Sequence, residues 1–252
     1  MIQLKNVCAG YEGKEVLHNI CVEFPAGRIT AIVGPNGCGK STLIKSLVRT
    51  HPHTSGEIFV KDKNIKNYSS KELAQQVAYV AQNKQIPDIS VLKMVLHGRF
   101  PYLSYPRRYR KEDLEIAREA LNWAGLSQVE DELVSHLSGG MQQKVYIAMA
   151  LAQDSAAVLM DEPTTYLDIS HQLRLMKMIR QLAEEGKTIV LVLHDLSQAL
   201  RIADEVVVLK EGSIVSIGTP LQVYESGKLE EAFGVKIERV ETKSGWHYIS
   251  QL

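Results

Sequence analysis

The chain has 252 residues and carries 29 basic and 29 acidic side chains, so its formal net charge is zero. An apolar content of 45% and a charged content of 23% are ordinary for a globular protein and exclude a disordered or collagen-like chain. Zero net charge argues against wholesale nucleic-acid binding, and three cysteines without C-x-x-C spacing argue against a disulfide framework or a zinc site.

No apolar run approaches the roughly 18 residues of a membrane-spanning helix. The N-terminus also lacks the pattern of a signal peptide, so we expect a cytoplasmic protein.

Short apolar strands alternate with helical stretches along the chain, which is typical of an α/β fold with parallel strands. Strands are predicted at 29–33, 77–81, 156–160 and 189–193, and a hairpin at 206–217. Helices are predicted at 40–48, 111–124, 141–153, 169–184 and 197–203. The segment from about 85 to 154 has no good strand, so we expect a helical subdomain inserted into the sheet domain.

A phosphate-binding loop follows the first predicted strand. The pattern G-x-x-x-x-G-K-[ST] is matched by Gly34, Pro35, Asn36, Gly37, Cys38, Gly39, Lys40 and Ser41, and a helix-like run opens with Ser41 and Thr42. Glycines let backbone N–H groups surround phosphate oxygens, and the helix N-terminus adds a favourable potential for anions. Lys40 is expected at the β- and γ-phosphates of a nucleotide, and Ser41 is expected to ligate Mg²⁺.

Two acidic residues, Asp161 and Glu162, follow the strand predicted at 156–160. A carboxylate at the end of a buried strand is costly without a partner, and a Mg²⁺ ion held by Ser41 and the nucleotide provides one for Asp161. Glu162, one residue further, is expected to orient or deprotonate the water that attacks the γ-phosphate. The plainer alternative is a pair of solvated acids, and the upstream phosphate loop favours the metal site.

Four polar side chains follow the four predicted strands, namely Lys40, Gln82, Asp161 and His194. Ligands of open α/β sheets bind outside the carboxyl ends of the strands, so these residues predict a single site. His194 is expected to donate a hydrogen bond to the γ-phosphate, and Gln82 to bind Mg²⁺ or its water. The plainer alternatives are a helix-capping histidine and an ordinary loop glutamine.

A second helix start suited to anions lies at Ser138, where two glycines, Gly139 and Gly140, expose backbone N–H groups. The run 137–141 resembles the Leu-Ser-Gly-Gly-Gln signature of ATP-binding cassette (ABC) ATPases, with Met141 in place of the usual Gln. The resemblance covers essentially the whole chain. It implies a P-loop ATPase fold with a mostly parallel central sheet, an antiparallel N-terminal β part and an inserted helical subdomain.

The domain organisation implied by this resemblance is a single ABC ATPase domain over 1–252. Its nucleotide-binding core is expected at 1–84 and 155–252, and its helical subdomain, with the signature, at 85–154.

The resemblance also implies roles for individual residues and two bound ligands, ATP and Mg²⁺. Tyr11 is expected to stack on adenine, Asp168 to belong to the D-loop at the nucleotide, and His194 to be the switch histidine. The signature residues Ser138, Gly139 and Gly140 are expected to contact the γ-phosphate of a nucleotide bound to a second copy. Two copies would therefore enclose two ATP molecules.

Within this family, residues 161–169 followed by His171-Gln172 look like importer ATPases for iron–siderophore, haem and cobalamin, as do 97–102 and 147–153. This likeness implies an ATP-hydrolysing subunit at the cytoplasmic face of the membrane. Its partners would be two transmembrane permease subunits and, through them, an extracytoplasmic binding protein, with no nucleic acid. The alternative is a soluble ABC ATPase of iron–sulfur cluster assembly.

A basic, aromatic segment occupies residues 93–111. It contains no acids and six basic residues, interleaved with Phe100, Tyr102, Tyr105 and Tyr109: Lys93, Arg99, Arg107, Arg108, Arg110 and Lys111. Pro101 and Pro106 predict a loop for most of the segment. We expect it, as part of a Gln82–Lys111 surface, to meet the permease near an anionic membrane. The alternatives are single-stranded nucleic-acid binding and a solvated loop.

Overall fold

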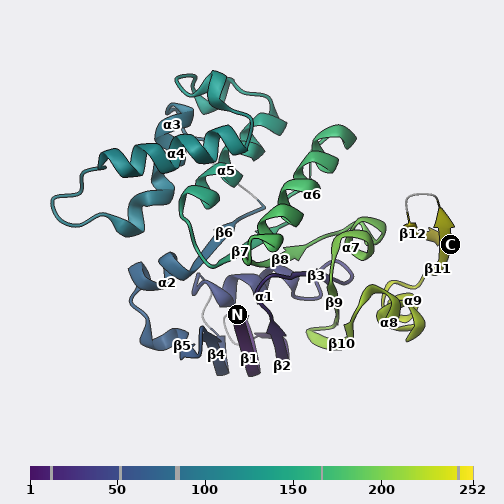
Figure 1. Ribbon diagram of the computed structural model, residues 1–252. Helices are drawn as coiled ribbons and strands as arrows, with labels where there is room; N and C mark the ends of the chain where they lie inside the picture. Colours follow the sequence, from purple (N-terminus) through teal and green to yellow (C-terminus); the bar gives the residue numbers. More distant parts are fainter. Residues whose placement is uncertain (12–13, 51–52, 83–85, 166, 243–244, 252) are drawn as a thin grey trace.

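The computed structural model describes residues 1–11, 14–50, 53–82, 86–165, 167–242 and 245–251. Figure 1 shows two sheets in the lower half of the molecule, a block of helices above them and a small hairpin at the C-terminus. Helix α1 (Lys40–Leu47) lies between the two sheets, and its buried side chains pack against both.

The inner sheet has six strands in the order β10-β9-β3-β8-β7-β6. Strands β9 to β6 run parallel, and β10 pairs antiparallel with β9. The bounds are Ile29–Val33 (β3), Val77–Val80 (β6), Ala157–Asp161 (β7), Thr188–Val192 (β8), Glu205–Lys210 (β9) and Ser213–Gly218 (β10). The predicted parallel sheet and the predicted β9–β10 hairpin are confirmed, and each strand end lies within one residue of its predicted place.

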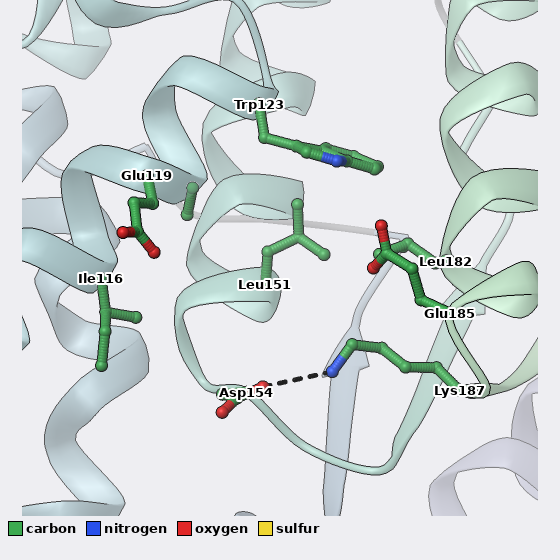
Figure 2. Close-up of a pocket in the computed structure, with 9 residues that line it drawn as sticks. Ile116, Glu119, Trp123, Leu151, Asp154, Leu182, Glu185 and Lys187 are labelled. Carbon is green, nitrogen blue, oxygen red and sulfur yellow. Dashed lines mark hydrogen bonds and ion pairs between the residues drawn. The ribbon is translucent and has the colours of Figure 1, made fainter.

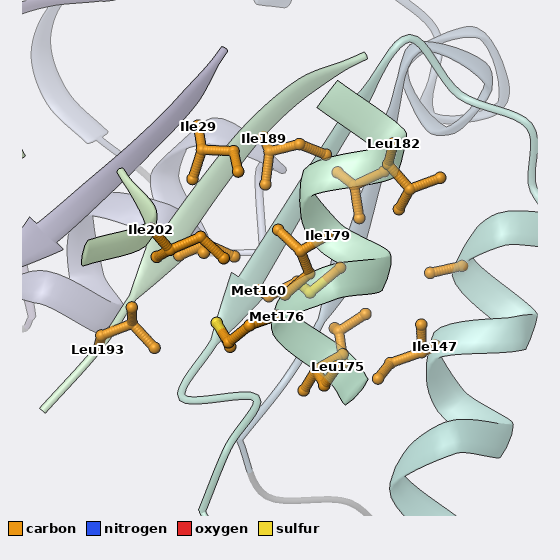
Figure 3. Packing of buried hydrophobic residues seen from close by; sticks show 14 of the residues in the cluster. Ile29, Ile147, Met160, Leu175, Met176, Ile179, Leu182, Ile189, Leu193 and Ile202 are labelled. Atoms are coloured by element: carbon orange, nitrogen blue, oxygen red, sulfur yellow. The ribbon is translucent and has the colours of Figure 1, made fainter. Parts of the chain in front are cut away.

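Alternate residues of the inner strands face two different hydrophobic cores, because successive side chains of a strand point to opposite faces. Ala31 belongs to the core on the side of the helical block, whereas Ile32 belongs to the core around α1 and the N-terminal sheet. In Figure 3, Met160 and Ile189 of the sheet meet Ile179 of helix α6 (Ile169–Glu184) in the first core. Burial on both faces explains why the parallel strands are mostly apolar.

The outer sheet is antiparallel, with the order β2-β1-β4-β5. Its strands are Ile2–Tyr11 (β1), Lys14–Phe24 (β2), His53–Val60 (β4) and Lys63–Asn64 (β5). The antiparallel N-terminal part implied by the family resemblance is therefore present. Pairing of β1 with β2 is interrupted at three places, between Leu4 and Val7, between Val7 and Ala9 and between Ala9 and Gly10, where the register shifts.

The helices between β6 and β7 form the block at the top of Figure 1. They are α3 (Val91–Leu96), α4 (Lys111–Trp123) and α5 (Gly139–Ala152), with 3₁₀ helices at His97–Tyr102, Ser127–Val129 and Val134–His136. The prediction that most of 93–111 is a loop is wrong for 93–102, which is helical. Pro101 does not prevent this, because a short 3₁₀ turn has few internal hydrogen bonds to lose.

Arg99 corrects a second expectation about this segment. Its guanidinium is buried, with Nε 3.0 Å from Asp113 Oδ1 and Nη1 donating to the Ala152 carbonyl at 2.9 Å. Arg99 therefore holds α4 and α5 together inside the helical block, and it is not part of an exposed basic surface.

The remaining helices are α2 (Ser70–Gln76), α7 (Leu196–Ile202), α8 (Pro220–Glu225), α9 (Lys228–Phe233) and a 3₁₀ turn at Ile65–Asn67. The C-terminal hairpin, β11 (Lys236–Thr242) and β12 (Gly245–Gln251), packs against α7. Its Tyr248 is buried and meets Tyr224 edge-on, with ring centroids 5.5 Å apart. Within the described ranges, no helix has the length and apolar character to cross a membrane.

Candidate functional site

The phosphate loop runs from β3 into α1. A Cβ at Gly34 would lie 2.1 Å from the Leu209 carbonyl oxygen, so only glycine fits there. Gly39 is the N-cap of α1 and has a φ of 106°, which side chains rarely adopt. The two glycines together let the backbone turn sharply into the helix, whose first N–H groups have no partner within the helix.

Lys40 is buried inside this loop. Its ammonium Nζ donates to the carbonyl oxygens of Gly34 at 2.7 Å and Pro35 at 2.9 Å. Cys38 is also buried, and burial raises the pKa of its thiol. Its side chain faces the interior near Gly34, so any contact of Cys38 with a ligand has to come from its backbone.

Two neighbouring cavities open beside the loop, at the edge of the inner sheet where the parallel strands end. The first, about 350 Å³, is lined by Val16, Asn36, Gly37, Gly39, Lys40, Ser41, Thr42, Gln82, Glu162 and His194. The second, about 330 Å³, is lined by Tyr11, Ser41, Lys45, Thr50, Tyr79, Ala81, Gln82 and Asp161. Since Ser41 and Gln82 line both, the structure brings the four strand-end residues Lys40, Gln82, Asp161 and His194 together.

Asp161 is the last residue of β7 and is 2% exposed. Within the described part of the chain, its Oδ1 atom has no hydrogen-bond partner. Burial raises the pKa of this carboxyl, and the Ser41 hydroxyl opposes the rise by hydrogen bonding. A buried carboxylate oxygen without a partner, beside a serine hydroxyl, fits a Mg²⁺ ion, which binds proteins through few carboxylates and keeps its other positions for phosphate and water.

Glu162 lies next in the chain, in a left-handed backbone conformation with a φ of 51°. This turn carries its side chain to the first cavity, where one carboxylate oxygen meets His194 Nε2 and the other accepts from Gln82 Nε2. The Thr165 hydroxyl also donates to the Glu162 oxygen that Gln82 contacts, Oε2, at 3.4 Å. The expected partners of Gln82 and His194 were the metal and the phosphate. In the structure both side chains contact Glu162, so they hold the candidate base in place.

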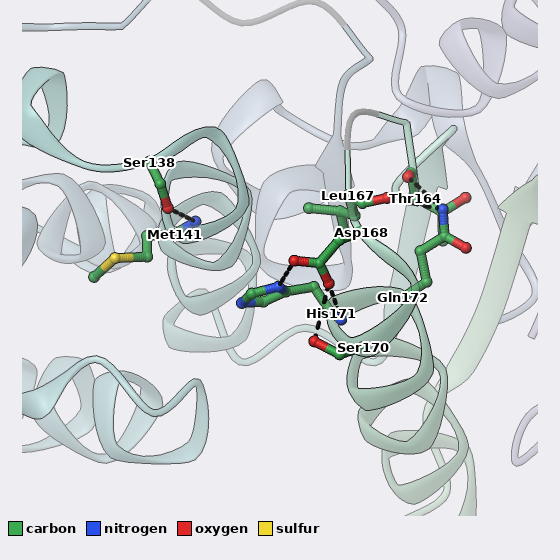
Figure 4. Close-up of polar contacts among 8 residues, drawn as sticks. All are labelled: Ser138, Met141, Thr164, Leu167, Asp168, Ser170, His171 and Gln172. Atoms are coloured by element: carbon green, nitrogen blue, oxygen red, sulfur yellow. Dashed lines mark hydrogen bonds and ion pairs between the residues drawn. The ribbon is translucent and has the colours of Figure 1, made fainter.

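The signature and D-loop residues lie outside both cavities. Ser138 is the N-cap of α5, and Asp168 is the N-cap of α6 (Figure 4). Hydrogen bonds from His171 and Ser170 lower the pKa of Asp168 to about 2. None of Ser138, Gly139, Gly140 and Asp168 lines either cavity, so within one chain the structure does not bring them to the phosphate loop.

Lys45 and Tyr79 line the second cavity but were not among the predicted site residues. Lys45 lies four residues after Ser41 on α1, so helix periodicity places it on the same face, and its charge lowers the pKa of Asp161. The pKa of Tyr79 is raised by burial and by the nearby Asp161. No motif marks Tyr79, whose position depends on the pairing of β6 with β7.

A further cavity, of about 280 Å³, lies away from this edge, between α4, the end of α5 and the end of α6 (Figure 2). Trp123 and Leu151 form part of its wall, and Lys187 pairs with Asp154 at 3.3 Å. None of the predicted site residues lines it.

Comparison with known proteins identifies relatives across most of the chain. A family model described as ABC transporter matches residues 17–165. The chain is 43% identical over 229 residues to the ferric enterobactin transport ATP-binding protein FepC of Escherichia coli, covering 90% of this chain and 84% of that protein. It is 37% identical over 233 residues to the iron(3+)-hydroxamate import ATP-binding protein FhuC of Bacillus subtilis, covering 92% and 87%.

Solved structures with the same fold include two whose descriptions bear on assembly. One is described as an inward-facing conformation of a metal-chelate type ABC transporter, with a TM-score of 0.86 and 26% identity, and the match covers 100% of this chain and 97% of that chain. The other is a dimeric bacterial ABC transporter cassette, with a TM-score of 0.77 and 30% identity, covering 87% and 99%.

Proposed function

Because this chain belongs to the ABC transporter family of ATP-binding proteins, we propose that it is the ATP-hydrolysing subunit of an importer for iron–siderophore complexes. The main structural support for ATP hydrolysis is that Lys40, Asp161 and Glu162 line two neighbouring cavities beside one phosphate loop. The cargo class is supported by the two relatives, 43% and 37% identical, that are named for ferric enterobactin transport and iron(3+)-hydroxamate import. Neither of these two relatives is named for iron–sulfur cluster assembly, the alternative function.

ATP is proposed to occupy the two joined cavities. Tyr11, about half exposed at the rim of the second cavity, would stack on adenine. The loop amides and Lys40 would bind the phosphates, with Lys40 exchanging the carbonyls of Gly34 and Pro35 for phosphate oxygens. Ser41, Asp161 and Gln82 would hold Mg²⁺, which when bound neutralises charge on the phosphates.

Glu162 is proposed as the base. Its carboxylate is 8% exposed, and its contacts with Gln82 and His194 fix its orientation in the wall of the first cavity. There it would accept a proton from the water that attacks the γ-phosphate. His194 would pass from Glu162 to the phosphate as charge builds up on the transferred group, because an imidazole N–H can serve either acceptor.

A second copy of the chain is proposed to complete each site. The start of α5, with Ser138, Gly139 and Gly140, and the D-loop residue Asp168 line neither cavity of their own chain. Exposed N–H groups at a helix start suit a γ-phosphate. In the proposed dimer, ATP lies between the phosphate loop of one copy and the signature of the other, and hydrolysis lets the copies separate.

The permease is proposed to dock on the surface formed by residues 86–111, which lies beyond Gln82. Tyr105 is 96% exposed there, and Phe100 is about half exposed, with the Arg107 guanidinium 4.6 Å from its ring centroid. Buried Arg99 connects this segment to α4 through its ion pair with Asp113. Exposed aromatic and basic side chains suit a protein interface next to an anionic membrane surface. Two permease subunits, with an extracytoplasmic binding protein beyond them, would hold the chain at the cytoplasmic face.

The direct test is affinity capture from solubilised native membranes, using the Glu162→Gln protein with ATP and Mg²⁺. We expect this variant to retain bound ATP and to recover an integral-membrane permease, together with its ferric siderophore when that ligand is supplied. The matched control is Lys40→Ala, which should bind ATP poorly and recover less permease. Recovery of cytosolic cluster-assembly proteins instead of a membrane protein would refute the importer assignment.

A further inference from the structure

The start of α5 is held by two reciprocal hydrogen bonds. The Ser138 hydroxyl accepts the Met141 N–H at 3.4 Å. The Gln142 side chain, four residues after the cap, reaches back and donates to the Leu137 carbonyl at 3.0 Å. The loop before the helix and the first helical turn are thereby fixed to each other.

Helix α6 begins in the same way. The Asp168 carboxylate accepts the His171 N–H at 2.8 Å, and the Gln172 side chain donates to the Leu167 carbonyl at 3.1 Å. The signature and the D-loop thus end in two helix starts of matching construction, and Figure 4 shows the bond between Met141 and Ser138 at the first and the bonds of Asp168 at the second. Since both are stiff units, their relative placement is decided by what lies between them.

The His171 side chain lies between these two helix starts. Its Nδ1 is 2.8 Å from Asp168 Oδ2, so the carboxylate binds both the ring and the backbone N–H of this residue. Gly140 has no side chain, but a Cβ built on it would lie 3.8 Å from the imidazole ring and 3.6 Å from a methyl group of Leu167, so both side chains lie beside this glycine. The ring therefore lies between Asp168 and Gly140, next to Leu167.

The chemistry of the pair fixes the orientation of the ring. An ionised carboxylate can only accept hydrogen bonds, so the Nδ1 atom that faces Asp168 carries a proton. The side chain is 29% exposed, and it is held at the ring by a charge-assisted bond. A second tie, from Gln143 Nε2 to the Pro163 carbonyl at 2.8 Å, keeps α5 attached to the loop after Glu162 when the ring is removed.

We propose that His171 is a positioning residue, which places the signature glycines relative to the D-loop through its Nδ1 bond to Asp168 and its position beside Gly140. This inference rests on the proposed function, because the surface it shapes is the one that would receive the nucleotide of a second copy. His171 itself touches neither cavity of its own chain.

The test compares His171→Ala with His171→Asn. Asparagine keeps an N–H donor at about the place of the imidazole Nδ1, whereas alanine removes it. Lys177→Ala, an exposed substitution on the same helix, is the matched control. Each is made in the intact protein for ATPase kinetics and in the Glu162→Gln background for ATP-dependent dimerisation, and thermal melting verifies that each variant is folded.

With alanine we expect about a tenfold loss in kcat and about a tenfold higher ATP concentration for half-maximal dimerisation, because small misplacements of binding groups are costly. Binding of a fluorescent ATP analogue to the monomer should be unchanged, since the phosphate loop is untouched. Asparagine should bring both kcat and the ATP concentration for half-maximal dimerisation most of the way back to wild-type values. Both variants lack the ring current of the imidazole, so the comparison is made between them: in the nucleotide-free monomer, the amide NMR resonances of Gly139 and Gly140 should differ between the alanine and the asparagine variant.

Alanine with wild-type kinetics and dimerisation would overturn the inference, and so would equal loss with alanine and asparagine or identical glycine resonances in these two variants. The parent Glu162→Gln protein separates this failure from a failure of the proposed function. If the parent does not dimerise with ATP, the proposed sandwich is wrong, while the glycine resonances still decide whether His171 positions the signature.

Discussion

Asp161 and Glu162 are adjacent acids that lie in different surroundings, and the tasks proposed for them differ accordingly. Asp161 ends a buried strand with one oxygen unpartnered among the described residues, while Glu162 turns away in a left-handed conformation and finds two side-chain partners. A fixed carboxylate with hydrogen-bond partners suits proton transfer, and a carboxylate whose oxygen lacks one suits a cation. A single change of backbone direction between two residues therefore separates the proposed metal ligand from the proposed base.

Asp161→Asn should raise the free energy of unfolding of the nucleotide-free protein at pH 8 by about 1 kcal/mol, the lower end of the cost of a buried unsatisfied group. Burial raises the folded-state pKa of Asp161 above the ordinary aspartate value of 3.8. The charge therefore reduces stability above the folded-state pKa, and this reduction disappears as the pH falls toward 3.8.

Thermal melting between about pH 8 and about pH 4.5 measures this effect, and the gap between Asp161→Asn and wild type should narrow as the pH falls. Added Mg²⁺ and ATP should stabilise the wild type more than the variant. A variant that is less stable than the wild type without ligands would contradict the cost assigned to the one unpartnered oxygen of this carboxylate.

At the scale of elements, the buried pair Arg99–Asp113 joins the 3₁₀ helix after α3 to α4. Asp113 also caps α4 by accepting the Arg110 N–H at 3.0 Å. Because both side chains are at most 9% exposed, loss of one leaves the other buried without its partner.

Arg99→Met should lower the free energy of unfolding by about 3 kcal/mol, measured by urea denaturation. The matched control is Lys111→Ala, which removes the exposed pair with Glu115 and should cost less than about 0.5 kcal/mol. Equal effects of the two substitutions would show that the buried pair contributes nothing beyond a surface pair.

The central strands could be predicted from sequence because burial on both faces makes them mostly apolar, and their ends then located Lys40, Gln82, Asp161 and His194. Strands of the outer sheet escaped residue-level prediction. In β1 the register shifts around Asn6, whose φ is 50°, so the alternation of a half-buried strand is interrupted. Partners such as Gln82 with Glu162 depend on how loops from distant strands pack, and no local pattern encodes them.

At the scale of the whole molecule, each copy offers two surfaces of different kind. The first surface contains the two cavities lined by the phosphate loop, Asp161 and Glu162. The second is formed by the starts of α5 and α6, which lie outside these cavities. A closed pair with two-fold symmetry would use each surface once per nucleotide, so two complete sites arise from two incomplete chains.

Mixing two inactive variants tests this arrangement. Lys40→Ala disables the phosphate loop and Ser138→Arg disables the signature, so each variant alone should hydrolyse ATP very slowly. A mixed dimer combines the intact loop of one with the intact signature of the other, and an equal mixture should recover up to about a quarter of wild-type phosphate release. Absence of recovery, with both variants folded, would place the signature contact within the same chain.

The Lys40 ammonium already has two carbonyl acceptors within its own loop. In the proposed complex, nucleotide binding would exchange these acceptors for phosphate oxygens at a cation that is already in place, and the entropy of ordering the loop would be lost when the chain folds rather than when the ligand arrives. Affinity for the phosphates would thus depend on a competition between the two peptide carbonyls and the phosphate oxygens for the Lys40 ammonium. When the product leaves, the ammonium can bind the same two carbonyls again, which favours release of the product as well as entry of the substrate.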